Sequence, residues 1–384
     1  MKFNSNLKIV FTILLVILLI SIIFFGEIHN SLLKYKFYNV ILRVLPIELK
    51  DFTKRHLINY SDLEKISYKN FKYSKKIGFQ NFQKDLKKKY ILNESQIKFN
   101  QIKDEDLLNK IITNNNFELF SVSFYDVIEF GVLIKNKKFR SNNLIIYIQG
   151  HRGNPFDNKY FLDLKNKYLN RNYDILALSM SNLGLNKEKF LSTHLEFPNK
   201  NSSNRRHEIY SDFKDLNYPE KKPLSLMLSG NYYLIKNILL KKNYDKIILT
   251  GISGGGWYTT LLTPIINEID ISISFSGTKP LHYVYYRCCH DWEQKYSSIW
   301  KGFNYEDFYY MSTFRLKNNS IFRRKSYQIY DLNEGEIFGG RFAQSMKKIS
   351  DNINSEFFKV LIKDEGLHEI SISVIDQLIN ENLK

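Results

Sequence analysis

Short apolar segments alternate with longer amphipathic segments from about residue 117 to the end of the chain. Short apolar runs predict strands, and longer runs with helical spacing predict helices. The predicted strands cover 117–124, 130–134, 144–148, 174–178, 246–250, 271–275, 327–330 and 357–362. The predicted helices cover 157–169, 224–240, 257–266, 342–349 and 370–383. The first two strands alternate like a hairpin, and the later alternation of strands with helices predicts an α/β fold, a mostly parallel sheet with helices on both faces.

An aromatic-rich insertion at about 278–320 interrupts this alternation between two predicted core strands. Its aromatic residues include Tyr283, Tyr285, Tyr286, Trp292, Trp300, Phe303 and Tyr305. An insertion at this point predicts a cap over a site at the carboxyl ends of the strands. Two interpretations of the rings stay open: they line a pocket for sugars or acyl chains, or they pack a small core of the cap.

The N-terminal segment predicts a membrane anchor. The segment from Ile9 to Phe25 contains no charged residue, Pro or Gly. Its length of 17 residues is at the short end of the range for a transmembrane helix. No small-x-small cleavage site follows, so an uncleaved anchor is favoured over a secretory signal. We therefore divide the chain into an anchor (1–26), a membrane-proximal helical arm (27–110) and a folded domain (111–384). We expect a cytoplasmic N-terminus and an extracytoplasmic domain.

The chain is basic, with 56 Lys and Arg against 39 Asp and Glu and a net charge of +17. The excess is spread over a chain rich in Lys, Asn and Ile, and no Arg-rich or aromatic-interleaved basic patch stands out, so we expect no nucleic-acid partner. Cys288 and Cys289 are the two cysteines. Adjacent cysteines offer no zinc spacing, and they do not decide the redox compartment.

The segment Gly251-Ile252-Ser253-Gly254-Gly255 has the G-x-S-x-G pattern of a nucleophile elbow. In such an elbow a serine projects from a sharp turn between a strand and a helix, and small residues on either side let the helix approach the strand. Here the predicted strand 246–250 precedes the motif and a predicted helix follows it. The context predicts Ser253 as a nucleophile, against the alternative of an ordinary glycine-rich turn.

A serine nucleophile requires a base and a carboxylate that orients the base. His368 follows the last predicted strand, where a loop histidine reaches the elbow; the alternative is a surface histidine before a helix. The acid candidates after strand 327–330 are Asp331, Glu334 and Glu336. Glu334 is favoured because it lies in the turn, and Asp331 comes next because it ends the strand.

Two backbone N–H groups are expected to stabilise the oxyanion. One belongs to Gly254, directly after the nucleophile. The other belongs to the loop after strand 144–148, where His151 or Arg152 is favoured and Gly150 and Gly153 permit a tight turn. This chemistry requires neither a metal nor a cofactor.

With these motifs, residues from about 117 to 384 resemble the α/β-hydrolase superfamily. Within it the chain is similar to a bacterial subgroup that pairs a GISGGGW elbow with a downstream DWEQ segment, here Gly251–Trp257 and Asp291–Gln294. That pattern continues with a Tyr-rich stretch, an acid turn and a late histidine, which match 305–310, Glu334 and His368. The subgroup tends to carry Asp where this chain has Glu334. Asp291 and Glu293 of the DWEQ segment could either shape the mouth of the pocket or cap a helix, and helix capping is favoured.

Together these features predict a membrane-anchored serine hydrolase with an α/β-hydrolase fold and a cap insertion. It would cleave carboxylic esters of small molecules, glycans or lipids through Ser253, His368 and Glu334. A peptidase or an acyltransferase with the same residues is the alternative, as is a catalytically silent binding protein on this scaffold. The pattern names neither the acyl group nor the oligomeric state.

Overall fold

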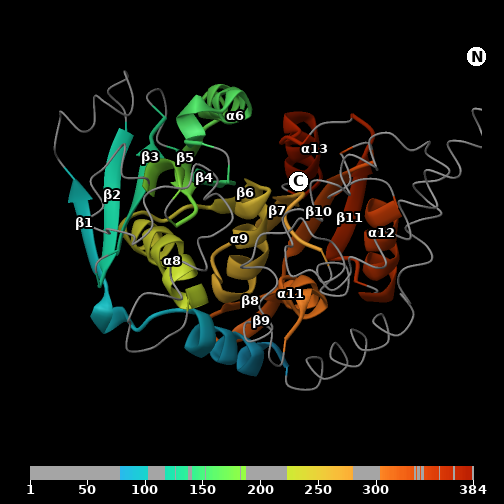
Figure 1. Cartoon of the computed structure of the whole chain (residues 1–384), viewed down its shortest axis with the longest axis horizontal. Coiled ribbons are helices and arrows are strands. Elements are labelled where there is room, and N and C mark those ends of the chain that lie inside the picture. The colour runs from blue at the N-terminus through green and yellow to red at the C-terminus, as the bar shows by residue number, and fades with distance from the viewer. Residues whose placement is uncertain are drawn as a thin grey trace, which may run out of the picture. The chain divides into compact units, whose positions relative to one another are not determined.

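The computed structural model describes Glu334, Phe338 and the ranges 78–102, 117–125, 127–136, 141–151, 153–181, 183–186, 223–279, 303–332, 341–353, 355–365 and 368–382. Within these residues a nine-stranded sheet has the order β1-β2-β3-β5-β4-β6-β7-β10-β11 (Figure 1). The strands are β1 (Lys98–Ile102), β2 (Phe117–Phe124), β3 (Val127–Ile134), β4 (Asn143–Gln149), β5 (Tyr173–Ser179), β6 (Lys246–Ile252), β7 (Ile271–Phe275), β10 (Lys325–Asp331) and β11 (Phe358–Lys363).

Strand direction divides the sheet into two parts. The pairs from β1 to β5 are antiparallel, and the predicted hairpin is confirmed by the register of β2 with β3. Every pair from β5 to β11 is parallel. Strands of a parallel sheet covered on both faces have almost continuously apolar sequences, and Leu144–Ile148 of β4 is fully buried. The predicted mostly parallel sheet is therefore confirmed.

Helices cover both faces of the sheet, as the alternation predicted (Figure 1). They are α6 (Lys159–Leu169), α8 (Pro223–Lys241), α9 (Gly254–Leu262), α12 (Arg341–Ile353) and α13 (Ile372–Asn382). Phe161 of α6 and Ile375 of α13 belong to one hydrophobic cluster. Leu234 of α8, Trp257 of α9 and Met346 of α12 belong to the other. The parallel strands thus lie between two apolar layers, and their carboxyl ends remain available for a site.

Residues 78–102 pack with this domain, although the sequence pattern places them in the helical arm. A helix at 78–90 buries Phe82 and Leu86 completely in the core. The following turn is held to α8, because Leu92 N donates to Ser229 Oγ (2.8 Å) and Tyr233 Oη donates to Leu92 O (2.7 Å). β1 then extends the sheet. The apolar residues at helical spacing in 78–90 therefore pack into the core of the domain.

Several predicted features lie outside the described residues. They are the anchor, the arm up to residue 77, Cys288, Cys289 and the DWEQ segment. Within the part of the chain that the structure describes, no helix has the length and apolarity to span a bilayer.

The end of the aromatic insertion packs into the domain core. It contains α11 (Tyr305–Met311), followed by a hairpin of β8 (Phe314–Lys317) and β9 (Ser320–Arg323). Phe303 and Phe308 contact Phe82 edge-on, and Tyr305 Oη accepts a hydrogen bond from Trp257 Nε1 (2.7 Å). For these residues the structure supports the packing interpretation over the pocket interpretation. The tryptophans 292 and 300 lie outside the described residues.

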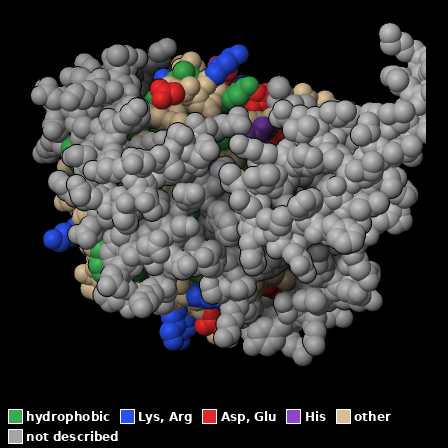
Figure 2. Space-filling model, in the orientation of Figure 1, with side chains coloured by type: hydrophobic (Ala, Val, Ile, Leu, Met, Phe, Trp, Pro, Cys, Tyr) green, Lys and Arg blue, Asp and Glu red, His purple; other side chains and the backbone are tan. Residues whose placement is uncertain are grey.

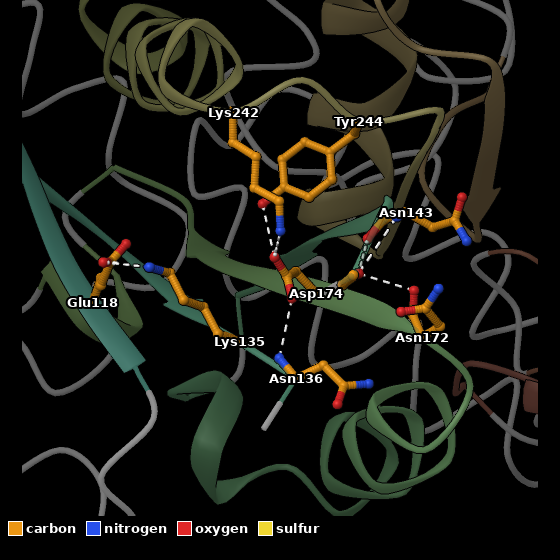
Figure 3. A network of polar contacts seen from close by, with 9 residues as sticks. Glu118, Lys135, Asn136, Asn143, Asn172, Asp174, Lys242 and Tyr244 are labelled. Atoms are coloured by element: carbon orange, nitrogen blue, oxygen red, sulfur yellow. Dashed lines mark hydrogen bonds and ion pairs between the residues drawn. The ribbon is translucent and has the colours of Figure 1, made fainter. Parts of the chain in front are cut away.

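A polar network stabilises the edge of the sheet at which the parallel strands begin (Figure 3). Asp174 at the start of β5 is buried, and its carboxylate accepts from Lys242 Nζ (2.8 Å), Tyr244 Oη (3.0 Å) and Asn136 N (3.0 Å). Burial and the Asp174 charge raise the pKa of the Tyr244 hydroxyl. The network connects the end of α8 to the amino end of β5. The predicted site lies at the carboxyl ends of the strands, so we assign the network a structural role.

Arg324 is a buried cation that caps the far end of α9. α9 continues into a 3-10 turn, η6 (Thr263–Ile265). Arg324 is 3% exposed, and its guanidinium donates to the carbonyls of Thr263, Ile266, Ile269, Ser312 and Phe314, at 2.5–3.2 Å. Carbonyls at a helix end have no partner within the helix, and a cation there also interacts favourably with the helix dipole. Arg324 therefore holds the helix that follows Ser253.

Replacement of this guanidinium should destabilise the whole domain. Arg324→Met leaves buried carbonyls without donors, so we expect the free energy of unfolding to fall by about 3 kcal/mol or more. Urea denaturation followed by circular dichroism measures this change. Arg323→Met is the matched control: Arg323 lies over the Phe314 and Phe357 rings near the surface, and its loss should cost about 1 kcal/mol or less. Equal losses for the two variants would contradict the capping role.

Candidate active site

Ser253 occupies a strained turn between β6 and α9. Its backbone has φ 55° and ψ −125°, a conformation that L residues rarely adopt. Ser253 N donates to Phe275 O of β7 (2.9 Å), and Ser253 O accepts from Trp257 N (2.9 Å) in the first turn of α9. The predicted order of strand, serine and helix is confirmed. A non-glycine residue held at positive φ is a frequent feature of functional sites.

Glycines let α9 begin directly against the sheet. A Cβ atom on Gly255 would lie 2.0 Å from Ile148 O of β4, and one on Gly251 would lie 2.5 Å from Gly255 O. No side chain fits at such distances without moving the backbone. The helix consequently starts at Gly254, three residues before the predicted start at Trp257, because close packing outweighs the low helix propensity of glycine.

His368 and Glu334 form a hydrogen-bonded pair. His368 follows β11, and its Nδ1 contacts Glu334 Oε1 in the segment that follows β10. The Glu334 side chain is 6% exposed, whereas that of His368 is 35% exposed. The ring of Phe338 stacks on the imidazole with a centroid separation of 6.1 Å. The structure thus brings together the residues predicted as acid and base, with the carboxylate buried and the imidazole open to solvent on one side.

Asp331, the second acid candidate, holds the loop that carries His368. It is buried at the end of β10, and its Oδ2 accepts from Glu365 N (3.0 Å) and lies 3.9 Å from Lys363 Nζ. Leu332 N also donates to Lys363 O (2.7 Å). These contacts fix the chain as it leaves β11 towards the histidine. Glu336, the third candidate, lies outside the described residues.

Ser276 is a residue of this site that the sequence pattern did not indicate. It follows β7, has φ 44°, and donates from Oγ to Glu334 Oε2. Its neighbour Phe275 accepts the hydrogen bond from Ser253 N. The end of β7 therefore contacts both the strained turn and the acid. A small polar residue directly after an apolar core strand is the one signal in the sequence that marks it.

The loop after β4 lies beside the serine turn, as predicted for the oxyanion loop. A Cβ atom on Gly150 would lie 2.9 Å from Ser253 Cβ and 3.3 Å from Gly254 N. The buried His151 packs its imidazole on Gly254, since a Cβ there would lie 2.5 Å from His151 Cε1. Arg152, the alternative donor, lies outside the described residues.

The carboxyl ends of β4, β6, β7, β10 and β11 thus surround one region, which is where ligands bind in open α/β sheets. Among the described residues no group of His, Cys, Asp or Glu is arranged to hold a metal ion. The sheet order, together with a serine at the strand–helix turn of a central parallel strand, defines an α/β-hydrolase-like fold. The predicted fold class is confirmed to that extent.

The sequence matches no protein-family model, and a comparison with curated proteins gives no match. Among solved structures, acetyl xylan esterase 1 from Thermoanaerobacterium sp. is 11% identical with a TM-score of 0.48, over 79% of this chain and 92% of that one. A family 15 glucuronoyl esterase from Caldicellulosiruptor kristjansonii is 12% identical with a TM-score of 0.48, over 79% and 83%. A Pyrococcus horikoshii acylaminoacyl peptidase is 14% identical with a TM-score of 0.45, over 74% and 44%. Likenesses of this size carry no argument about the reaction.

The role assigned to Asp331 predicts a local effect on the His368 loop. Asp331→Ala removes the acceptor of the Glu365 N–H, so we expect amide exchange at 363–365 to accelerate about 10- to 100-fold, as the loss of one hydrogen bond to a charged group implies. Hydrogen–deuterium exchange followed by mass spectrometry measures this rate. Asp331→Asn is the matched control, because its amide oxygen still accepts. Slow exchange in Asp331→Ala would rule out this role.

Proposed function

We propose that the chain is a serine hydrolase that cleaves carboxylic esters through an acyl-enzyme. The observation that supports it most directly is the His368–Glu334 pair, which is located at the same sheet edge as the strained Ser253 turn. A serine hydroxyl is a weak nucleophile until a base removes its proton, and an imidazole is oriented for this task by a carboxylate on Nδ1. A silent binding protein would have no need of a buried carboxylate paired with an open imidazole.

In the proposed mechanism Ser253 Oγ attacks the carbonyl carbon of the ester while His368 Nε2 takes the hydroxyl proton. Glu334 keeps the proton on Nδ1 and stabilises the imidazolium. The N–H groups of Gly254 and His151 receive the oxyanion. The tetrahedral intermediate collapses, His368 returns the proton to the departing alcohol, and the acyl group stays on Ser253. Water then repeats the sequence, releasing the acid and restoring the serine.

Ser276 supports this mechanism as a positioning residue for the acid. Its hydroxyl donates to Glu334 Oε2, so the carboxylate rotates less freely and presents Oε1 to His368. Glutamate has one more side-chain torsion than aspartate, and a fixed second oxygen restrains it. The departure from the Asp of the resembling subgroup is therefore compatible with an oriented imidazole.

The proposal includes a membrane anchor formed by Ile9–Phe25 and an extracytoplasmic hydrolase domain that acts on small-molecule, glycan or lipid esters. The uncharged apolar run supports the anchor. A panel of esters, peptides and acyl acceptors offered to the purified full chain separates an esterase from a peptidase or an acyltransferase. Protease digestion of intact cells, compared with lysed cells, tests on which side of the membrane the domain lies.

Loss of the nucleophile should abolish covalent labelling. We expect the full chain to react with a fluorophosphonate probe and Ser253→Ala to remain unlabelled with an unchanged circular dichroism spectrum. Ser350→Ala is the matched control, because this serine lies on α12 and donates to Phe358 O. Gel fluorescence after probe treatment gives the comparison. Labelling of Ser253→Ala to the wild-type extent would refute Ser253 as the nucleophile.

The buried carboxylates of Glu334 and Asp331 should differ sharply in their effect on hydrolysis. Glu334→Gln removes the charge that stabilises the His368 imidazolium, so we expect kcat/KM for p-nitrophenyl acetate to fall about 10³-fold or more. Asp331→Asn keeps the contact to the Glu365 amide and should cost less than about tenfold. The reverse order of losses would move the acid role to Asp331.

A further inference from the structure

Glu129 is a carboxyl group buried within the domain, and the proposed reaction through Ser253, His368 and Glu334 does not use it. It lies on β3 and is fully buried. Its Oε1 contacts Ser181 Oγ just after β5, and its Oε2 accepts from Asn231 Nδ2 of α8 (3.5 Å). The carboxyl group also fills the space over Gly230, where a Cβ atom would lie 1.9 Å from Oε2. The side chain thus joins β3, β5 and α8.

The number of protons available for the hydrogen bonds of Ser181 indicates whether Glu129 is protonated or ionised. Ser181 Oγ carries one proton and has two close oxygens, Glu129 Oε1 and the carbonyl oxygen of Met227 (2.8 Å). A carbonyl oxygen only accepts, so Ser181 donates to Met227 O. The contact between Ser181 Oγ and Glu129 is then a hydrogen bond only when Glu129 supplies the proton. An ionised Glu129 would instead compete with Met227 O for the single hydroxyl proton.

The same network extends to the helix that starts at the serine turn. Tyr258 of α9 donates from Oη to Met227 O (3.0 Å) and accepts from Ser181 N (3.3 Å). Each hydrogen bond of the network has one donor and one acceptor when Glu129 is neutral. The pairing of these hydroxyl and carboxyl groups matters here, because an unpaired polar group in a buried site costs more than a hydrogen bond gains.

Ser181 is adjacent to a residue that contacts the proposed oxyanion donor. Met180 is fully buried, and a Cβ atom on Gly254 would lie 2.2 Å from Met180 Sδ. The sulfur therefore rests on Gly254 beside the His151 ring. A displacement of Ser181 would move Met180 with it. The packing of Met180 against Gly254 would then change, and with it the position of the Gly254 N–H group.

We propose that neutral Glu129 is a positioning residue for the oxyanion site, holding Ser181 and Met180 against Gly254 through its own proton. This inference rests on the proposed function, since Gly254 is an oxyanion donor only in that mechanism. Burial also raises the pKa of Glu129 to about 8. The residues facing it are Ser181, which follows β5, Gly230 and Asn231 from α8 and, through Ser181, Tyr258 from α9. Among these only Tyr258 has a titratable side chain.

Ionisation of Glu129 should therefore impair the enzyme at alkaline pH. Below about pH 8 the carboxyl group is neutral and donates to Ser181, and above it the charged form disrupts the Ser181 contact. We expect kcat/KM of the full chain for p-nitrophenyl acetate to fall about eightfold between pH 7.5 and pH 9, mainly through kcat. E129Q should keep neutral-pH activity and lose this decline, because its amide N–H donates to Ser181 permanently. A decline of equal size in both proteins would overturn the proposal.

Two further measurements keep the test independent of folding and of activity. Infrared difference spectra between pH 7 and pH 9.5 should show loss of a protonated-carboxyl band in the wild type and no such change in E129Q; absence of the band in the wild type would refute the proton assignment. Ser181→Ala removes the group that transmits the effect, so its kcat/KM should be low and show no alkaline decline, and wild-type behaviour would refute the proposal. Failure of Ser253→Ala to abolish hydrolysis would instead refute the proposed function and leave the infrared result standing.

Discussion

The left-handed backbone of Ser253 is the constraint on which the rest of the site depends. A non-glycine residue in such a conformation costs on the order of 1–3 kcal/mol and persists only where its surroundings enforce it. Here β7 enforces it by accepting the Ser253 N–H, and the first turn of α9 does so by donating to Ser253 O. The glycines of the turn allow α9 to reach β4, and Arg324 holds the other end of that helical segment through its carbonyls. Contacts at both ends of this helical segment thus hold Ser253 in its strained conformation.

A second strained serine lies directly beside the first. Ile252 and Phe275 are register partners on β6 and β7, so Ser253 and Ser276 are the next residues on two adjacent strands, and both have positive φ. Ser253 turns the chain into α9, and the Ser276 hydroxyl points at Glu334. Because the two strands are hydrogen-bonded neighbours in the core, the contact that restrains Glu334 comes from the same pair of strands that holds the Ser253 turn. This coupling explains how residues from distant parts of the chain form one site.

Much of the domain follows from sequence pattern, and the exceptions have physical reasons. Strand 144–148 was predictable because burial on both faces demands a continuous apolar run. β1 was missed because it is an exposed edge strand whose KFNQI sequence has no apolar face. The pairing of His368 with Glu334 followed from chain order, whereas Ser276 and Glu129 act through contacts between strands that no local pattern encodes. The start of α9 was placed too late because tertiary packing overrides the propensity of glycine.

Glu334 and Glu129, two of the buried glutamates among the described residues, differ in the donors that surround their carboxyl groups. Oε2 of Glu334 accepts from the Ser276 hydroxyl, and Oε1 contacts Nδ1 of His368, which carries a proton in the proposed mechanism. A carboxylate in that position is satisfied without a proton of its own and can stabilise an imidazolium. In the network proposed for Glu129, the one proton of the Ser181 hydroxyl is directed at Met227 O, so the carboxyl group is the donor to Ser181. Burial disfavours charge at Glu129, and the donors around it do not compensate. Similar burial thus produces opposite roles, because the neighbouring hydroxyl is a donor in one case and an acceptor in the other.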